Sequence, residues 1–269
     1  MTGQNPPTSS SQEASGEGGA RRTRIAVAGG TGVLGRHVVE IARLRGHDAI
    51  ALAPSTGVDL VAGTGLDGAL DGVGAVVDVT SIQTQSARAS ERFFGAVTRH
   101  LLQAEKAAGV GHHVALSIVG ADKAPYGYYA GKVLQERLVT EGDVPWTLMR
   151  ATQFHEFVGQ IMERLRRGPL VIAPRMRSQP VAAREVAGRL IDLVEAGPSG
   201  RVPDFGGPRE EQAVDMVRAF KAATGARVWI LPVPFPGALG RALRDGTLVA
   251  GPGSDHGTQT YADWLRSAR

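Results

Sequence analysis

The sequence contains no cysteine, which excludes disulfide bonds and every metal site or nucleophile that depends on a thiolate. Lysine is nearly as scarce, because arginine supplies most of the positive charge; the four lysines are Lys106, Lys123, Lys132 and Lys221. No apolar run reaches the roughly 18–20 residues that span a bilayer, and the N-terminus lacks a basic segment followed by an apolar one. We therefore expect a cytoplasmic protein with no membrane partner.

The net charge of +4 is small for a chain of 269 residues, and no long basic run is present. The densest arginine cluster, between Arg164 and Arg177, is typical of a solvated face, so no nucleic-acid partner is expected. His112 and His113 are adjacent and alternate between the faces of a predicted strand, which argues against a metal site. Residues 1–22 are rich in Ser, Gly, Pro, Gln and Glu and predict a disordered tail.

A glycine turn between a predicted strand and a predicted helix is the most informative segment. The apolar run Ile25–Ala28 predicts a buried strand, and apolar residues from Val33 onward recur at helical spacing. Between them, glycines spaced three apart allow a tight turn, close approach of a pyrophosphate and close packing of the helix. The predicted cofactor contacts of this turn are Gly29, Gly30, Thr31, Gly32, Val33, Leu34 and Gly35. A plain glycine-rich turn is the alternative.

Strands and helices alternate through the first 150 residues, which predicts an α/β fold with a doubly wound parallel sheet of Rossmann type. The predicted strands cover residues 25–28, 48–53, 58–61, 75–80, 113–117 and 146–150. The predicted helices cover residues 33–45, 66–70, 90–108 and 128–140. After Arg150 the pattern loosens, and residues 151–269 are expected to form an irregular, substrate-covering portion of one domain that spans residues 23–269.

Tyr128 and Lys132 lie four residues apart at the start of a predicted helix and therefore share one face of it. Ser117 lies at the end of the preceding predicted strand, and ligands of open α/β sheets bind at that edge. These three residues are predicted to converge beside the dinucleotide as catalytic residues. The alternative is a packing tyrosine, a surface lysine and a strand-end serine with no chemical role.

A resemblance to a known family rests on five segments: Gly29–Gly35, Leu116–Gly120, Tyr128–Lys132, Trp146–Arg150 and, more weakly, Arg184–Ala187. On these segments the sequence resembles the short-chain dehydrogenase/reductase superfamily, and more narrowly its atypical, NmrA-like NAD(P)-binding branch. The resemblance covers residues 23–269. Its glycine and Tyr/Lys motifs are specific to the superfamily and do not name a substrate.

The resemblance implies an NAD(P)H-dependent oxidoreductase that reduces a small or medium carbonyl compound, or oxidises the alcohol, by hydride transfer. Tyr128 would act as general acid or base, while Lys132 would lower the pKa of its phenol and hold the nicotinamide ribose. Ser117 would hydrogen-bond the reacting oxygen. Many family members also carry an asparagine that completes a proton relay on the preceding helix, and residues 90–108 contain none.

The cofactor is expected to be NADP, with NAD possible, because no acidic residue ends the second strand to bind a ribose 2′-hydroxyl. Ser55, Thr56 and Arg36 are expected near a 2′-phosphate, and the resemblance places Asp59 and Leu60 near the adenine. The loops after two predicted strands are expected to wall a substrate pocket; the residues are Ser81, Gln83, Gln153, Phe154 and His155. A structural role for the histidine is an equal alternative.

Two other functions remain open. A non-catalytic, NmrA-like regulator would bind the dinucleotide without turnover, although such proteins typically lack the Tyr/Lys pair. An NAD-dependent isomerase or epimerase would hold its cofactor tightly and show no net cofactor turnover. A small-molecule substrate is the expected partner, and both a monomer and a homodimer are compatible with the sequence.

Overall fold

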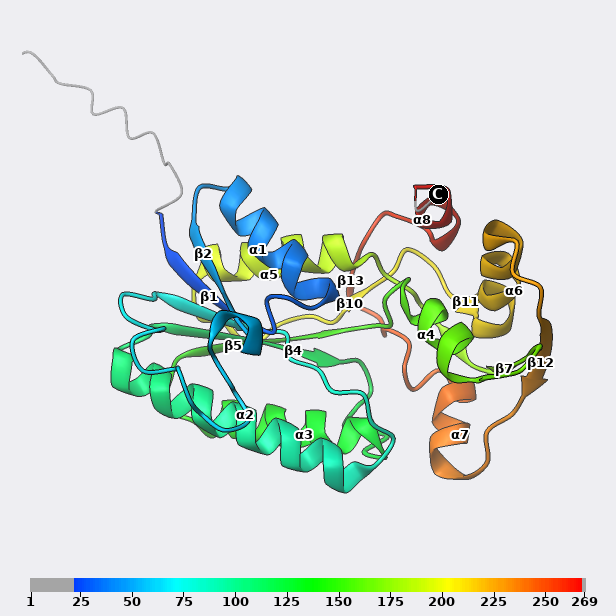
Figure 1. Ribbon diagram of the computed structural model, residues 1–269, viewed down its shortest axis with the longest axis horizontal. Helices are drawn as coiled ribbons and strands as arrows, with labels where there is room; N and C mark the ends of the chain where they lie inside the picture. The colour runs from blue at the N-terminus through cyan, green and yellow to red at the C-terminus, as the bar shows by residue number, and fades with distance from the viewer. Residues whose placement is uncertain (1–21, 268–269) are drawn as a thin grey trace, which may run out of the picture.

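The structure, a computed structural model, describes residues 22–267. The tail predicted at residues 1–22 therefore lies outside the described part, apart from Arg22. Figure 1 shows a sheet with helices on both faces and, beside it, a smaller C-terminal part. Helices α1 (Val33–Leu44) and α5 (Ala183–Ala196) cover one face, and α2 (Ala87–Ala108) and α3 (Tyr128–Thr140) cover the other.

The main sheet has the strand order β13-β10-β5-β4-β3-β1-β2, with β9 beside β5, and every pair in it is parallel. The strands are β1 Arg24–Ala28, β2 Asp48–Leu52, β3 Ala75–Asp78, β4 His112–Ile118, β5 Trp146–Ala151, β9 Gly200–Arg201, β10 Phe205–Gly206 and β13 Asp255–His256. Strand β1 lies between β2 and β3. The chain therefore passes from β1 to β2 on one side and then crosses back to β3 on the other side. Ligands of open α/β sheets bind at such a reversal, outside the carboxyl ends of the strands.

The two faces of the sheet bury different side chains, because residues alternate along each strand. On β1, Ile25 and Val27 belong to the apolar cluster shared with α1 and α5, whereas Ala26 and Ala28 belong to the cluster shared with α2. All four side chains are fully buried. A strand covered on both faces requires such an unbroken apolar run, which is why β1 could be predicted from the sequence.

Two predicted elements between β2 and β3 are wrong. Residues 58–61 form turns around an isolated bridge rather than a strand, and residues 66–70 form turns rather than a helix. Gly63, Gly65 and Gly68 have φ values of +74° to +79°, a left-handed conformation through which neither a strand nor a helix continues. Most apolar side chains of both segments are still buried, which explains why their pattern imitated regular structure.

Much of the chain after β5 forms a smaller set of elements with an apolar cluster of its own, whereas α5, β9, β10 and β13 belong to the main sheet and its cover. The helices are α4 Phe157–Arg164, α6 Ala213–Thr224, α7 Gly237–Asp245 and α8 Tyr261–Ser267; the strands are β6 Arg166–Arg167, β7 Leu170–Pro174, β8 Arg177–Ser178, β11 Glu211–Gln212 and β12 Trp229–Val233. The sequence predicted irregular structure here and missed β12. Pro232 within that segment argues against a strand, but β12 lies at the edge of its sheet, where a proline is tolerated.

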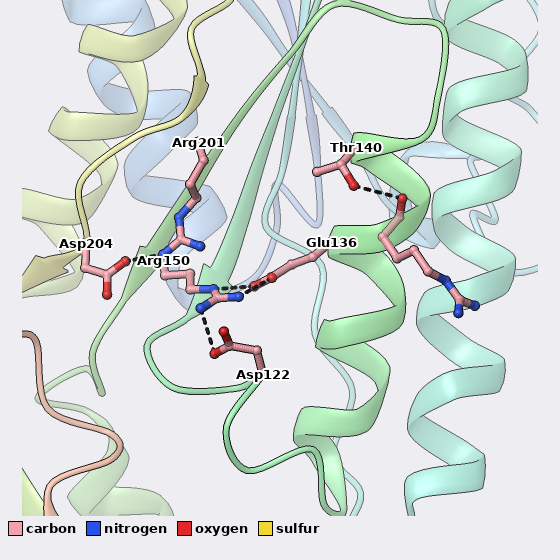
Figure 2. A network of polar contacts seen from close by, with 7 residues as sticks. Asp122, Glu136, Thr140, Arg150, Arg201 and Asp204 are labelled. Atoms are coloured by element: carbon pink, nitrogen blue, oxygen red, sulfur yellow. Dashed lines mark hydrogen bonds and ion pairs between the residues drawn. The ribbon is translucent and has the colours of Figure 1, made fainter.

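An ion-pair cluster joins β5 to α3, the helix that carries Tyr128 and Lys132 (Figure 2). Arg150 Nε and Nη2 donate to the two carboxylate oxygens of Glu136 at 2.7 and 2.5 Å, and Nη1 donates to Asp122 at 2.8 Å. The side chain of Arg150 is 9% exposed and that of Glu136 is 13% exposed. Because both charges are largely buried, each depends on the other to offset the loss of hydration.

Arg150→Met should lower the free energy of unfolding by about 2–4 kcal/mol, because Glu136 would keep a largely buried charge without its partner. Arg201→Met is the matched control. Arg201 pairs with Asp204 nearer the surface, and the loss of that pair should cost less than about 1 kcal/mol. Urea unfolding measures both variants, and equal losses would contradict a special role for the Arg150 cluster.

Candidate functional site

The glycine turn joins β1 to α1 through contacts that leave no room for a side chain. A Cβ on Gly35 would lie 2.1 Å from the carbonyl oxygen of Gly29, and a Cβ on Gly30 would lie 2.6 Å from the Cβ of Ala51. Gly29 itself has a φ of +80°, in the left-handed region. The turn therefore brings α1 directly against the carboxyl end of β1.

Gly32 differs from these glycines, because the protein around it has room for a side chain. Its Cβ would meet only the carbonyl oxygen of Gly29, at 3.2 Å, and would otherwise enter open space. Thr31, Gly32 and Val33 are exposed, and within the described residues the start of α1 has neither a side-chain cap nor an acidic residue in its first turn. The residues present fit a phosphate group, which binds the free N–H groups and the positive dipole end of such a helix.

The loop after β3 lies against the glycine turn and carries a hydroxyl that meets Tyr128. A Cβ on Gly29 would lie 3.1 Å from the carbonyl oxygen of Val79 and 3.2 Å from the backbone of Thr80. In the next residue, Ser81 Oγ lies 3.0 Å from Tyr128 Oη. A turn that fits phosphate and a tyrosine hydroxyl therefore lie at the same edge of the sheet, linked by one loop.

Lys132 lies one helical turn after Tyr128 and is almost completely buried. Its Nζ donates to the carbonyl oxygen of Leu116 at 2.8 Å and to Gln135 Oε1 at 2.6 Å. The ammonium also lies 4.5 Å from the centre of the Phe94 ring, and the same ring packs edge-to-face on Tyr128. Phe94 therefore forms a shared wall for the two predicted catalytic side chains.

Burial acts in opposite directions on these two titratable groups. It lowers the pKa of the Lys132 ammonium to about 8, although the carboxylates of Asp78 and Glu136 raise that pKa. It raises the pKa of the Tyr128 phenol; the hydrogen bond with Ser81 opposes this effect and the Asp78 carboxylate adds to it. The phenol is therefore protonated at neutral pH. The structure thus differs from the expected lowering of this pKa, since the ammonium is held by its backbone and amide partners.

Ser117 lies on β4 with its hydroxyl buried, and its Oγ has no hydrogen-bond partner within residues 22–267. The hydroxyl paired with Tyr128 belongs to Ser81, which the sequence analysis placed in the substrate pocket. A catalytic role for Ser117 stays a prediction. Both serines stand at the ends of parallel strands, so the sequence had no signal to show which of them meets the tyrosine.

The predicted adenosine contacts lie in the segment after β2. Ser55 is exposed within the short 3₁₀ helix η1 (Pro54–Thr56). Asp59 is also exposed, and its Oδ1 accepts hydrogen bonds from two backbone N–H groups of its own turn. The Leu60 side chain is buried in the cluster under α2. All three stay predicted contacts, and Asp59 has a structural role in closing its turn.

The predicted substrate-pocket residues occupy two loops with different exposure. Ser81 and Gln83 are exposed on the loop after β3. Gln153 and Phe154 are half-buried after β5, where Gln153 Oε1 accepts a hydrogen bond from Ser178 Oγ at 3.0 Å. The first loop therefore offers groups that a ligand reaches directly, and the second offers a partly covered wall.

His155 is fully buried in an aromatic cluster of the C-terminal part. Its Nε2 lies 3.2 Å from the carbonyl oxygen of Gln259, and its ring packs on those of Tyr261 and Trp264. Burial lowers the pKa of His155, so the neutral imidazole prevails at neutral pH. These contacts favour the structural role that the sequence left as an equal alternative.

Within residues 22–267, no group of three or more His, Asp or Glu side chains is arranged to hold a metal ion. His112 and His113 meet different partners: His112 Nε2 lies 2.8 Å from Thr147 Oγ1, and His113 Nδ1 lies 2.9 Å from both carboxylate oxygens of Glu105. In the same range, every helix is too short or too polar to span a lipid bilayer.

Sequence reasoning missed three residues of the site. Phe94 packs against both catalytic candidates, Gln135 accepts a hydrogen bond from Lys132, and the Gln135 amide donates to Asp78 Oδ2 at 2.7 Å. A signal for two of them was present. Asp78 is a lone acid within the apolar run at residues 75–79, and Gln135 lies one helical turn after Lys132.

No protein-family model and no curated protein matches the sequence. Several solved structures share its fold. The NADPH-dependent quinone oxidoreductase of Escherichia coli, in complex with NADPH, is 21% identical over 91% of this chain and 99% of that chain, with a TM-score of 0.66. A short-chain dehydrogenase/reductase superfamily protein of Agrobacterium tumefaciens with bound NAD is 22% identical over 91% and 95%, with a TM-score of 0.63. The UDP-glucose 4-epimerase of Thermus thermophilus, in complex with NAD, is 18% identical over 91% and 92%, also with a TM-score of 0.63.

These similarities concern the fold. They confirm the predicted doubly wound α/β architecture, and the chain has the fold of short-chain dehydrogenase/reductase superfamily proteins. The narrower NmrA-like assignment stays a prediction, as do the roles of individual residues.

Gly35→Ala should lower the free energy of unfolding by about 3 kcal/mol or more, because its Cβ would overlap the carbonyl oxygen of Gly29 and force α1 to move. In a chain of this length that loss corresponds to a fall of roughly 6–12 °C in melting temperature. Gly32→Ala is the matched control and should shift the melting temperature by less than about 2 °C, since its Cβ would meet only the carbonyl oxygen of Gly29, at 3.2 Å, a contact that a small movement relieves. A wild-type melting temperature for Gly35→Ala in calorimetry would contradict the close packing of the turn.

Proposed function

We propose that this chain is an NAD(P)H-dependent oxidoreductase that reduces a small or medium carbonyl compound, or oxidises the matching alcohol, with Tyr128 as general acid or base. The observation that carries the proposal is the 3.0 Å contact between Tyr128 Oη and Ser81 Oγ, on a loop that lies against the glycine turn. Such a reaction needs a proton donor close to the site that holds the cofactor. The shared fold of an NADPH-dependent quinone oxidoreductase supports the proposal.

The glycine turn is the part of the chain that would hold the dinucleotide. Gly32 leaves space above the backbone, and the uncapped start of α1 supplies N–H donors for the pyrophosphate. Bound there, a nicotinamide dinucleotide supplies the two electrons of the reaction. Lys132 has three donors and uses two of them within the protein, so one N–H would remain for a ribose hydroxyl.

Tyr128 would supply the proton. Because burial keeps its phenol protonated at neutral pH, it can donate to the carbonyl oxygen of a substrate as negative charge develops there. Ser81 Oγ both donates and accepts hydrogen bonds, so it can hold the same substrate oxygen or the phenol.

NADP is the proposed form of the cofactor. An open depression of about 490 Å³ lies beside the glycine turn; its lining residues are Gly30, Arg36, Val39, Glu40, Arg43 and Leu44. Arg36 brings to it a guanidinium that suits a 2′-phosphate. The negative charge of Glu40 is balanced by Arg184, whose Nη1 lies 2.9 Å from the carboxylate. The depression therefore favours an anionic group over a plain 2′-hydroxyl.

The substrate would enter at the exposed loop that carries Ser81 and Gln83. Gln153 and Phe154 would form the opposite wall, where a half-buried amide and an aromatic ring suit a compound with one polar and one apolar side. Because Ser81 is exposed, a small or medium carbonyl compound would reach it directly from the solvent.

Gly32→Val should weaken NADPH binding at least tenfold while leaving the protein folded, because the new side chain would fill the space that phosphate needs above the turn. Isothermal titration calorimetry with NADPH and with NADH measures the affinities, and the wild type should bind NADPH more tightly. Wild-type affinity in a folded Gly32→Val protein would remove the dinucleotide assignment.

Tyr128→Phe should lower turnover of a carbonyl substrate about 10²–10⁴-fold, the usual contribution of a positioned acid, while NADPH affinity barely changes. Tyr129→Phe is the matched control, because the Tyr129 side chain packs against an apolar cluster of the C-terminal part; its members are Met176, Ala213, Leu243 and Leu248. The loss of NADPH absorbance with a panel of ketones and aldehydes measures turnover. Full activity of Tyr128→Phe would show that the acid lies elsewhere. Binding without turnover of any compound by the wild type would favour the regulator instead.

A further inference from the structure

A chain of buried hydrogen bonds runs from Lys132 to the end of β3. Lys132 Nζ donates to Gln135 Oε1 at 2.6 Å, and Gln135 Nε2 donates to Asp78 Oδ2 at 2.7 Å. The other carboxylate oxygen, Asp78 Oδ1, accepts from Thr80 N at 2.9 Å and from Thr80 Oγ1 at 2.7 Å. Lys132, Gln135 and Asp78 are 4%, 1% and 0% exposed, so water does not compete for these contacts.

The groups at the two ends fix the direction of this chain. An ammonium only donates hydrogen bonds and a carboxylate only accepts them. The amide of Gln135 must therefore turn its oxygen toward Lys132 and its NH₂ toward Asp78. The three side chains form one polarised unit, in which a positive and a negative charge are joined across a neutral amide.

The groups that surround Lys132 on its own helix and on α2 leave its charge unbalanced. Glu136 is committed to Arg150 through two hydrogen bonds. Tyr128 is protonated at neutral pH and carries no charge. Phe94 offers only the face of its ring. None of these supplies the full counter-charge that a buried ammonium requires.

A second buried pair of titratable groups lies on this side of the sheet. His113 on β4 and Glu105 on α2 form a fully buried pair at 2.9 Å, and the Asp78 carboxylate raises the pKa of His113 only as the smallest of several effects. Asp78 is therefore the carboxylate that balances Lys132.

We propose that Asp78, acting through Gln135, is the counter-charge that keeps Lys132 protonated and oriented in the site, and that both are positioning residues for the reaction. Asp78 has a second contact with the site, because its other oxygen fixes Thr80, the residue before Ser81. One carboxylate therefore positions both the lysine and the loop that meets the tyrosine. The catalytic meaning of this inference rests on the proposed function, whereas the charge pairing is measured without any substrate.

NMR of protein labelled with ¹³C at the lysine ε carbon reports the protonation of each amine, and four lysines give a spectrum that single substitutions can assign. The Lys132 signal of the wild type should titrate near pH 8. Asp78→Asn should lower that midpoint by about one pH unit or more, because a negative charge is removed from a poorly hydrated site. In the reductase assay, the alkaline limit of turnover should move down by the same amount.

A double variant separates this electrostatic role from a merely structural one. In Asp78→Asn, the new amide turns an NH₂ group toward the NH₂ group of Gln135. Two donors then face each other, and the hydrogen bond between residues 78 and 135 is lost. Adding Gln135→Glu restores an acceptor for that amide and places a carboxylate beside Lys132. The Lys132 midpoint of the double variant should return to the wild-type value or rise above it.

Asp143→Asn is the matched control for the method. Asp143 forms an exposed pair with Lys106 at 2.5 Å and raises the pKa of that lysine. Its removal should lower the Lys106 midpoint and leave Lys132 unchanged. A Lys132 midpoint that also moved would show a general effect of net charge and would overturn the inference.

Circular dichroism establishes that each variant is folded. An unchanged Lys132 midpoint in folded Asp78→Asn, or no recovery in the double variant, overturns the inference. If Asp78→Asn does not fold, Gln135→Met removes the amide that links Lys132 to Asp78 and keeps both charges. An unchanged Lys132 midpoint in Gln135→Met equally overturns the inference. If the Lys132 shifts occur but no carbonyl compound is turned over, the proposed function fails and the charge pairing stands.

Discussion

The contact between Gly35 and the carbonyl oxygen of Gly29 is the constraint on which the candidate site depends. Because no Cβ separates them, α1 begins at the carboxyl end of β1, and because its N-cap residue is Gly32, no side chain caps its first N–H groups. The loop after β3 packs on the same turn and brings Ser81 to Tyr128. A larger residue at either glycine would move the N–H groups at the start of α1, which fit phosphate, away from the hydroxyl of Tyr128, which offers a proton.

The two faces of the sheet bury different chemistry. The face under α1 and α5 is covered by one continuous apolar cluster. The face under α2 and α3 also buries charge, in the pair of Glu105 with His113 and in the unit that joins Asp78, Gln135 and Lys132. Buried ion pairs add little net stability, so the place of the Asp78–Gln135–Lys132 unit beside the tyrosine is better explained by an electrostatic role in the site.

Helix α3 is fixed from several sides, and this fixes the tyrosine. Ser90 Oγ on α2 donates to the carbonyl oxygen of Tyr128 at 2.7 Å, an approach for which Gly131 leaves the room. Tyr129, the next residue, packs into the C-terminal part of the molecule. Two adjacent tyrosines therefore serve different purposes: one faces the site loop and the other joins the two parts of the chain. Proton transfer requires such fixed positions, because small displacements cost reactivity.

The sequence by itself determined the features that depend on near neighbours. The strand, glycine turn and helix, and the shared face of Tyr128 and Lys132, follow from backbone conformation and helix periodicity, which act over a few residues. The same local patterns misled where left-handed glycines interrupt residues 58–70. Tertiary structure alone decided which serine meets Tyr128, across 47 residues, and which acid Gln135 links to Lys132, across 57 residues. No periodicity relates residues so far apart, so these partners were set only when α2 and α3 packed under the sheet.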